Sequence, residues 1–250
     1  PRAPPAGPHR VSGIDSLVVV VPVHDEQEVL GACLEAIDTA AARVRAREAA
    51  GPRVQVVVVL DACTDASAEI TAAHAARGVR AVHCSARSVG AARALGVDAA
   101  TSRQASERWG RTWVATTDAD SRVPASWLED HLAAAEHGHD LLVGPVQPDP
   151  AGLDAPVLSA WHERHRGGRL HVHGANLGVR LSAYRAAGGF ADLGTGEDVE
   201  LVRALLEAGT PAVRQGRPVI TSAREHGRAP DGFAGYLRAL RIAVAEGASA

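Results

Sequence analysis

The stretch SLVVVVPVHDEQEVL, residues 16–30, joins a valine-rich apolar run to a polar turn and the start of a second pattern. Residues 16–23 are mostly β-branched, continuous and too few for a helix, which predicts a strand buried on both faces. From residue 26 to residue 50 the apolar side chains recur at helical spacing. The stretch therefore predicts a buried strand, a polar turn and a helix in succession.

The same unit recurs along the first half of the chain. Further strands are predicted at residues 53–60, 79–85, 111–120 and 140–146, and further helices at residues 65–78, 88–105 and 124–138. Strands that alternate with helices at this spacing require right-handed crossovers and give a mainly parallel sheet. The fold class predicted is therefore α/β, with helices covering both faces of the central sheet.

The chain is predicted to divide into an arm and two halves of one domain. Residues 1–13 are rich in proline and glycine without periodicity, which favours a flexible arm. Residues 14–147 carry the regular alternation, whereas residues 148–250 contain more glycine and charge and only irregular short elements. We expect the second half to fold onto the sheet and to shape a substrate site.

The composition excludes several classes of function. All 26 basic residues are arginine, so no lysine can serve a P-loop, a Schiff base or general-base catalysis. A net charge of −3 gives no indication of the basic surface that nucleic-acid binding requires. No apolar run reaches the roughly 20 residues of a transmembrane helix. Three scattered cysteines, Cys33, Cys63 and Cys84, indicate reduced thiols and a cytoplasmic protein.

Polar side chains gather where the predicted strands end, and ligands of open α/β sheets bind beyond these carboxyl ends. The residues are Pro22, His24, Asp25 and Glu26 after the first strand, Asp61, Thr64 and Asp65 after the second, Arg87, Gly90 and Arg93 after the third, and Asp118 and Asp120 in the fourth. The sequence therefore predicts a ligand site along this edge of the sheet.

Asp118 and Asp120 end an apolar run, where unpaired carboxylates are costly to bury. On an extended strand they would point to opposite faces, so both reach one ion only if the chain turns there. One or two carboxylates completed by substrate phosphates suit Mg²⁺ or Mn²⁺. A phosphatase with an aspartyl nucleophile also uses such a pair, but normally after its first strand. No G-x-G-x-x-G follows the first strand, which argues against a dinucleotide enzyme.

Several of these residues also have purely structural interpretations. Asp25 or Glu26 could lie in the first turn of a helix, and Asp65 is favoured as an N-cap. Arg93 could pair on a helix surface or bind a phosphate. For Asp61, which directly follows a buried strand, a ligand contact is favoured.

Taken together, the motifs resemble the nucleotide-sugar glycosyltransferases with the GT-A fold, closest to family 2. VVVVPVHDEQEVL, VVVVLDACTDAS, SARSVGAARALG and the D-x-D segment TTDADSRVPASWL follow one another in the family's order. HGANLGVRLSAYRAAGGF and GTGEDVEL resemble the acceptor region, with a Gly-Ala-Asn strand and a Glu-Asp helix start. The resemblance covers roughly residues 16–240 and implies a Rossmann-like nucleotide-binding half fused to an acceptor-binding half.

The resemblance implies a role for each motif. Pro22, His24 and Glu26 would line the nucleotide site, Asp61 would accept a hydrogen bond from the base, and Arg87 and Arg93 would suit the base edge or the diphosphate. Asp118 would lie near the ribose and sugar, and Asp120 would bind a Mn²⁺ or Mg²⁺ ion that bridges the diphosphate. The donor would be a UDP- or GDP-sugar.

The segment GTGEDVEL supplies the expected catalytic base. Acids in the first turn of a helix are also favoured by its dipole, and that structural role is part of the expectation. By resemblance Asp198 would deprotonate the acceptor hydroxyl, with Glu197 supporting or exchanging that role. In-line attack on the anomeric carbon would then invert its configuration.

Near the end of the chain, Arg224, His226 and Arg228 stand close together on an expected loop. His226 could be a second metal ligand, or the group could clamp the diphosphate, and the sequence leaves both open. Residues 233–244 have helical spacing, and packing against the domain is favoured over a membrane or partner contact.

Two motifs depart from the family. Leu60 and Asp61 stand where two acids are usual, and His24 and Asp25 replace an aromatic residue and an asparagine, so the nucleotide preference stays open. The Gln-x-x-Arg-Trp signature of processive synthases is absent from the sequence, which favours single addition of a sugar. A sugar-phosphate nucleotidyltransferase and a non-catalytic nucleotide-binding relative are the alternatives. The acceptor is not indicated, and a homodimer is left open.

Overall fold

A computed structural model describes residues 13–47, 51–166, 171–224 and 232–247, so almost all of the expected N-terminal arm lies outside it. Its strands form two sheets. The main sheet runs in the order β3 (Val79–Cys84), β2 (Arg53–Asp61), β1 (Ser16–Val23), β4 (Thr112–Thr116), β8 (Leu177–Arg180), β6 (Leu141–Val143) and β9 (Ala212–Val213). The small sheet runs β5 (Ser121–Arg122), β10 (Val219–Thr221) and β7 (Val146–Pro148).

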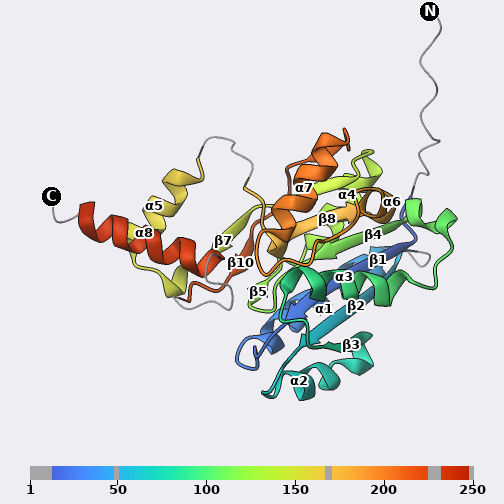
Figure 1. Cartoon of the computed structure of the whole chain (residues 1–250), viewed down its shortest axis with the longest axis horizontal. Coiled ribbons are helices and arrows are strands. Elements are labelled where there is room, and N and C mark those ends of the chain that lie inside the picture. The colour runs from blue at the N-terminus through green and yellow to red at the C-terminus, as the bar shows by residue number, and fades with distance from the viewer. Residues whose placement is uncertain (1–12, 48–50, 167–170, 225–231, 248–250) are drawn as a thin grey trace, which may run out of the picture.

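The main sheet is mostly parallel, as predicted. β1 pairs in parallel with β2 on one side and with β4 on the other, and β3 extends the parallel set. β8 is the exception, because it runs antiparallel to both β4 and β6. The second half of the chain therefore not only covers the sheet but supplies two of its strands, β9 and the internal β8, which is labelled in Figure 1.

Helices cover both faces of the main sheet because side chains of a strand alternate between faces. The odd-numbered residues of β1 share one hydrophobic core with α1 (Leu30–Arg47) and α4 (Trp127–Glu136). The even-numbered Val18 and Val20 share a second core with α3 (Val89–Thr101) and α7 (Glu197–Glu207). Two short helices, α2 (Ser67–Ala73) and α6 (Leu181–Ala186), complete the layers. Close packing of α3 on the sheet depends on Gly96, where a Cβ would lie 2.4 Å from Cγ1 of Val20.

A third, smaller core joins α5 (Ala155–Arg164) to α8 (Phe233–Gly247), which lie side by side beyond the small sheet (Figure 1). Leu237 and Leu240 of α8 are buried against Val157 and Trp161 of α5. The favoured expectation that this last helix packs against the domain agrees with these contacts. Among the described residues no helix combines the length and apolarity needed to span a membrane.

Several predicted elements differ in detail. The expected strand at residues 140–146 is two strands in different sheets, since β6 pairs with β8 and β9 whereas β7 pairs with β10. The expected boundary after residue 147 consequently falls inside β7. The Gly-Ala-Asn segment is not a strand but a 3-10 turn, Gly174–Asn176, directly before β8. The three cysteines form no disulfide, and the compartment stays a prediction.

Candidate active site

One cavity of about 410 Å³ lies at the carboxyl ends of β1, β2 and β4. Its walls include many of the predicted site residues: Pro22, His24, Glu26, Asp61, Arg87, Arg93, Asp118, Asp120, Glu197, Asp198 and Arg224. Four residues that the sequence also places along this edge of the sheet do not line the cavity: Asp25, Thr64, Asp65 and Gly90. His226 and Arg228 fall outside the described residues. Side chains that are up to 198 positions apart in the chain, Glu26 and Arg224, thus meet in one place.

The two carboxylates of the D-x-D segment lie on a turn rather than on a strand. β4 ends at Thr116, and the N–H of Ser121 donates to the carbonyl of Asp118 over 3.1 Å. This turn is the condition under which both carboxylates can face one site, and both line the cavity. They contact different arginines, since Asp118 pairs with Arg93 and Asp120 with Arg224.

Arg93 has contacts that differ from its predicted role at the base or diphosphate. Its side chain is only 3% exposed and reaches the cavity wall from α3. One terminal nitrogen, Nη2, donates to Asp118, and the other, Nη1, donates to the equally buried Glu197. Both terminal nitrogens are therefore engaged by carboxylates of the chain itself, which is how a buried guanidinium is normally stabilised.

Arg224 forms a second, more exposed bridge. It donates to both carboxylate oxygens of Glu26 over 2.6 Å, and its Nη2 lies 3.1 Å from Oδ2 of Asp120. Glu26 precedes α1, which begins at Leu30, so its carboxylate is not part of the first helical turn. Burial, followed by the negative charge of Asp118, raises the pKa of Asp120 to about 6.

The Asp61 side chain accepts hydrogen bonds from the loop after β3 and holds that loop in place. Its Oδ1 accepts from the N–H of Arg87 over 2.9 Å and its Oδ2 from the N–H of Ser88 over 3.0 Å. The Asp61 carboxylate is buried, and both of its oxygens already accept backbone hydrogen bonds. The expected contact with a ligand would therefore be in addition to this structural role. Ser88 in turn caps α3 by accepting from the N–H of Ala91. Asp61 thereby fixes the start of the helix that carries Arg93.

The loops after β1, β2 and β3 each hold one non-glycine residue in the left-handed region: Asp25 with φ 52°, Ala62 with φ 52° and Arg87 with φ 51°. Such conformations cost of order 1–3 kcal/mol each and cluster at functional sites. Hydrogen bonds offset the cost, because the N–H of Ala62 donates to Cys84 and that of Arg87 donates to Asp61.

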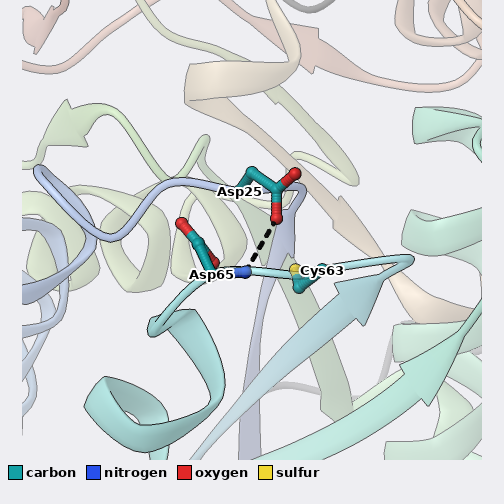
Figure 2. Close-up of side chains that lie close together, drawn as sticks. All are labelled: Asp25, Cys63 and Asp65. Carbon is teal, nitrogen blue, oxygen red and sulfur yellow. Dashed lines mark hydrogen bonds between the residues drawn. The ribbon is translucent and has the colours of Figure 1, made fainter.

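Asp25, Cys63 and Asp65 lie close enough together to suggest a cation site (Figure 2). Their polar atoms are used within the chain, however. Oδ1 of Asp25 accepts from the N–H of Thr64 over 2.6 Å and from that of Asp65 over 3.2 Å. Asp65 accepts from the N–H of Ser67, but the N-cap of α2 is Ala66 and not Asp65 as predicted. The Cys63 thiol donates to the carbonyl of Val23. Burial raises the pKa of Cys63, which favours the thiol over the ligating thiolate. The group joins two loops.

The two acids at the start of α7 have different surroundings. Glu197 is buried on Arg93, whereas Asp198 is partly exposed to the cavity. Oδ2 of Asp198 accepts from the N–H of Gly174 over 2.6 Å, and Oδ1 accepts from that of Val199 over 2.8 Å. A carboxylate offers about four acceptor positions, so two remain for a substrate. Of the two acids, Asp198 is the more accessible from the cavity.

Sequence reasoning missed His173 and Phe233, which also line the cavity. Their rings lie 5.7 Å apart, and burial lowers the pKa of His173. The signal for His173 was its position directly before the Gly-Ala-Asn segment, whose first residue donates to Asp198. Phe233 carried no such signal, because its place at the cavity depends on how α8 packs.

Solved structures share this architecture. The chain is similar to TarS 1–349 from S. aureus, with a TM-score of 0.59 and 14% identity over 91% of this chain and 64% of that chain. It is similar to the mannosyltransferase PcManGT from Pyrobaculum calidifontis, with a TM-score of 0.60 and 18% identity over 91% and 62%. It is also similar to glucosyl-3-phosphoglycerate synthase from Mycobacterium tuberculosis, with a TM-score of 0.58 and 15% identity over 92% of this chain and 80% of that chain. The chain thus spans less than two thirds of the TarS and PcManGT chains.

At such identities the likeness shows the fold alone, which is the GT-A fold. No curated protein sequence matches the chain. The sequence profile described as glycosyl transferase family 2, however, matches residues 18–180, which is more than half of the chain and includes most of β1, the D-x-D turn and β8. The chain therefore belongs to glycosyl transferase family 2.

Proposed function

We propose that this glycosyltransferase transfers one sugar from a UDP- or GDP-sugar to an acceptor hydroxyl, with a divalent cation and with inversion at the anomeric carbon. One observation carries the proposal: a single cavity is lined both by the D-x-D carboxylates, Asp118 and Asp120, and by Asp198 at the start of α7. The first pair suits the diphosphate side of a donor, and Asp198 suits the acceptor side.

The carboxylate oxygens of the D-x-D turn are suitable ligands for Mn²⁺ or Mg²⁺. Both ions bind carboxylate oxygens and complete their shells with phosphate and water. Asp120 is buried, and its burial, followed by the negative charge of Asp118, raises its pKa. A bound cation would stabilise the ionised carboxylate in this position. Asp120 would hold the ion, with His226 as a second ligand. When bound, the ion would supply charge neutralisation for the departing diphosphate.

Structural neighbours support the choice of donor. PcManGT was solved with GDP-Man and Mn²⁺, TarS with UDP, and the mycobacterial synthase with Mn²⁺ and UDP. In the present chain the cavity wall contains Pro22 of β1, His24 directly after β1 and Arg87 in the loop after β3. These residues would surround the nucleotide, and Arg224 would pass from Glu26 and Asp120 to the diphosphate.

The chain's own residues account for the transfer step. Asp198 would accept the proton of the acceptor hydroxyl as the oxygen attacks the anomeric carbon. The new bond to the acceptor oxygen forms on one face while the bond to the β-phosphate oxygen breaks on the other. The nucleoside diphosphate leaves with the electron pair of the broken bond. The N–H groups of Gly174 and Val199 hold the Asp198 carboxylate in place during this step.

Binding of nucleotides tests the donor side. We would titrate UDP, GDP and dTDP calorimetrically into the wild type with and without Mn²⁺, and repeat the titration with Asp120→Asn. The matched control is Asp15→Asn, whose carboxylate pairs with Arg111 and does not line the cavity. Mn²⁺-dependent binding of one nucleotide, lost in Asp120→Asn and kept in Asp15→Asn, is expected. If none of the three nucleotides binds, the donor assignment is wrong.

Turnover tests the acceptor side. Asp198→Asn keeps the size of the side chain and one oxygen for the Gly174 N–H but removes the base. We expect nucleotide binding to persist and hydrolysis or transfer of the donor to fall by about 10²–10⁴-fold. Unchanged turnover would contradict the base assignment. Release of pyrophosphate from a nucleoside triphosphate and a sugar phosphate would instead identify a nucleotidyltransferase.

A further inference from the structure

Arg93 is the residue through which the two sides of the cavity are joined. Its Nη2 donates to Asp118, on the turn after β4, and its Nη1 donates to Glu197, the first residue of α7. These partners are 25 and 104 positions away in the chain. One guanidinium therefore fixes the distance between the D-x-D turn and the start of α7.

The same guanidinium also borders the residue that holds Asp198. A Cβ on Gly174 would lie 2.3 Å from both Nη1 and Nη2 of Arg93, so only glycine allows this approach. The N–H of Gly174 donates to Oδ2 of Asp198. The position of Asp198 thus depends on two residues, its chain neighbour Glu197 and its hydrogen-bond partner Gly174. Both of these residues contact Arg93.

The burial of Arg93 argues against direct contact with substrate. Only 3% of its side chain is exposed, both terminal nitrogens are engaged, and the ring of Phe190 lies 5.8 Å from the guanidinium carbon. Asp118, by contrast, is 38% exposed and open to a ligand. A planar fork can bind two carboxylates at fixed angles, which the point charge of a lysine cannot reproduce.

We propose that Arg93 is a positioning residue: through Glu197 and Gly174 it places Asp198 at the correct distance from Asp118 and the donor. The inference rests on the proposed function for the roles of Asp118 and Asp198. Displacement of a reacting group by about 1 Å can cost on the order of 100-fold in rate. Arg93 would therefore affect the rate of transfer without affecting the affinity for the donor.

Three variants test this role. Arg93→Lys keeps the charge but loses the fork, and Gly174→Ala displaces the guanidinium without changing any charge. Arg180→Lys is the matched control, because Arg180 is also buried and paired, with Asp140 at 2.6 Å, but does not line the cavity. Hydrolysis of UDP-glucose and GDP-mannose would be measured together with calorimetric affinity for UDP and GDP in Mn²⁺.

We expect Arg93→Lys and Gly174→Ala to lower kcat by on the order of 100-fold. The KM for the donor and the affinity for the nucleotide should each change by less than about threefold, which is a small change in binding free energy. Arg180→Lys should keep kcat per folded molecule. A raised KM at unchanged kcat would overturn the inference by making Arg93 a donor ligand, while leaving the proposed function intact. Equal losses in Arg93→Lys and Arg180→Lys would also overturn it.

Hydrogen exchange gives a second readout that does not require turnover. The amides of Gly174 and Val199, which donate to Asp198, should lose protection in Arg93→Lys and keep it in Arg180→Lys. If their protection is unchanged in Arg93→Lys, the positioning role is refuted even where no donor is hydrolysed. If the wild type binds no nucleotide while these amides respond as expected, only the proposed function fails.

Discussion

Acid should destabilise this chain through one buried histidine, His131 of α4. Its side chain is fully buried beneath β4, where its Nδ1 lies 3.0 Å from Nε1 of Trp113. The indole N–H can only donate, so Nδ1 must be the acceptor and the imidazole must be neutral. The ring also meets Trp127 edge-on, with centroids 4.8 Å apart. Burial lowers the pKa of His131 from 6.5 to about 3.

The lowered pKa sets both the sign and the size of the effect. In the unfolded chain His131 takes up a proton below pH 6.5, whereas in the folded chain it does so only near pH 3. Its contribution is therefore fully present above pH 6.5 and is lost as the pH falls. The free energy of unfolding should decrease by about 1.4 kcal/mol per pH unit in this window, to a total of about 5 kcal/mol.

His131→Asn isolates this contribution. The Asn Oδ1 can still accept from Trp113 but does not titrate, and the smaller side chain should cost about 2 kcal/mol at pH 8 through the space it leaves. The wild type should therefore be more stable than His131→Asn at pH 8 and lose this difference as the pH falls. The free energies of unfolding of the two proteins should become equal about 1.5 pH units below 6.5, near pH 5.

Urea unfolding followed by tryptophan fluorescence at pH 8, 7, 6 and 5 measures the difference. Groups that titrate in both proteins cancel in this comparison, and His137→Asn, an exposed histidine at the end of the same helix, controls for loss of a histidine as such. A constant difference between wild type and His131→Asn from pH 8 to pH 5 would refute a buried, neutral His131.

Three further predictions concern the loops and the helix packing around the cavity. Asp61→Asn turns one acceptor into a donor that faces a backbone N–H, so thermal unfolding should report a loss of about 1–3 kcal/mol, accompanied by weaker nucleotide binding in calorimetry. Gly96→Ala should cost about 1–3 kcal/mol in urea unfolding because its Cβ would meet Val20, whereas Gly31→Ala, where a Cβ meets nothing within 4 Å, should stabilise α1 by up to about 1 kcal/mol. Ala62→Gly relieves a left-handed alanine, so the melting temperature should stay the same or rise, and a loss above about 1 kcal/mol would contradict the strain.

The first half of the fold was predictable because its strands are locally unambiguous. Residues 16–23 are a continuous valine-rich run with a turn behind it, and they form β1 with the predicted bounds. The division of residues 140–146 into two strands was not predictable, because β6 and β7 differ only in which distant strand they pair with. Likewise nothing local states that β8 enters the main sheet antiparallel to β4.

The position of the site could also be predicted, but the partners within it could not. Strand ends specify an edge of the sheet, and for that reason His24, Asp61 and Asp120 meet in one cavity. Whether an arginine at that edge binds a ligand or another side chain depends on burial. Arg93 has its partners 25 and 104 positions away, which no pattern of neighbouring residues reveals.

Burial also distinguishes Arg93 from Arg224 in what each arginine can do. Among the residues that the structure describes, Asp118 pairs with Arg93 and Asp120 with Arg224, so a cation that binds Asp120 must compete with Arg224. Arg224 is 30% exposed and can be rehydrated as it moves, and a nearby diphosphate would offer it a replacement anion. Arg93 is 3% exposed, and its departure would leave Glu197 buried without its partner. The physical expectation is that Arg224 exchanges partners during the reaction cycle while Arg93 stays in place.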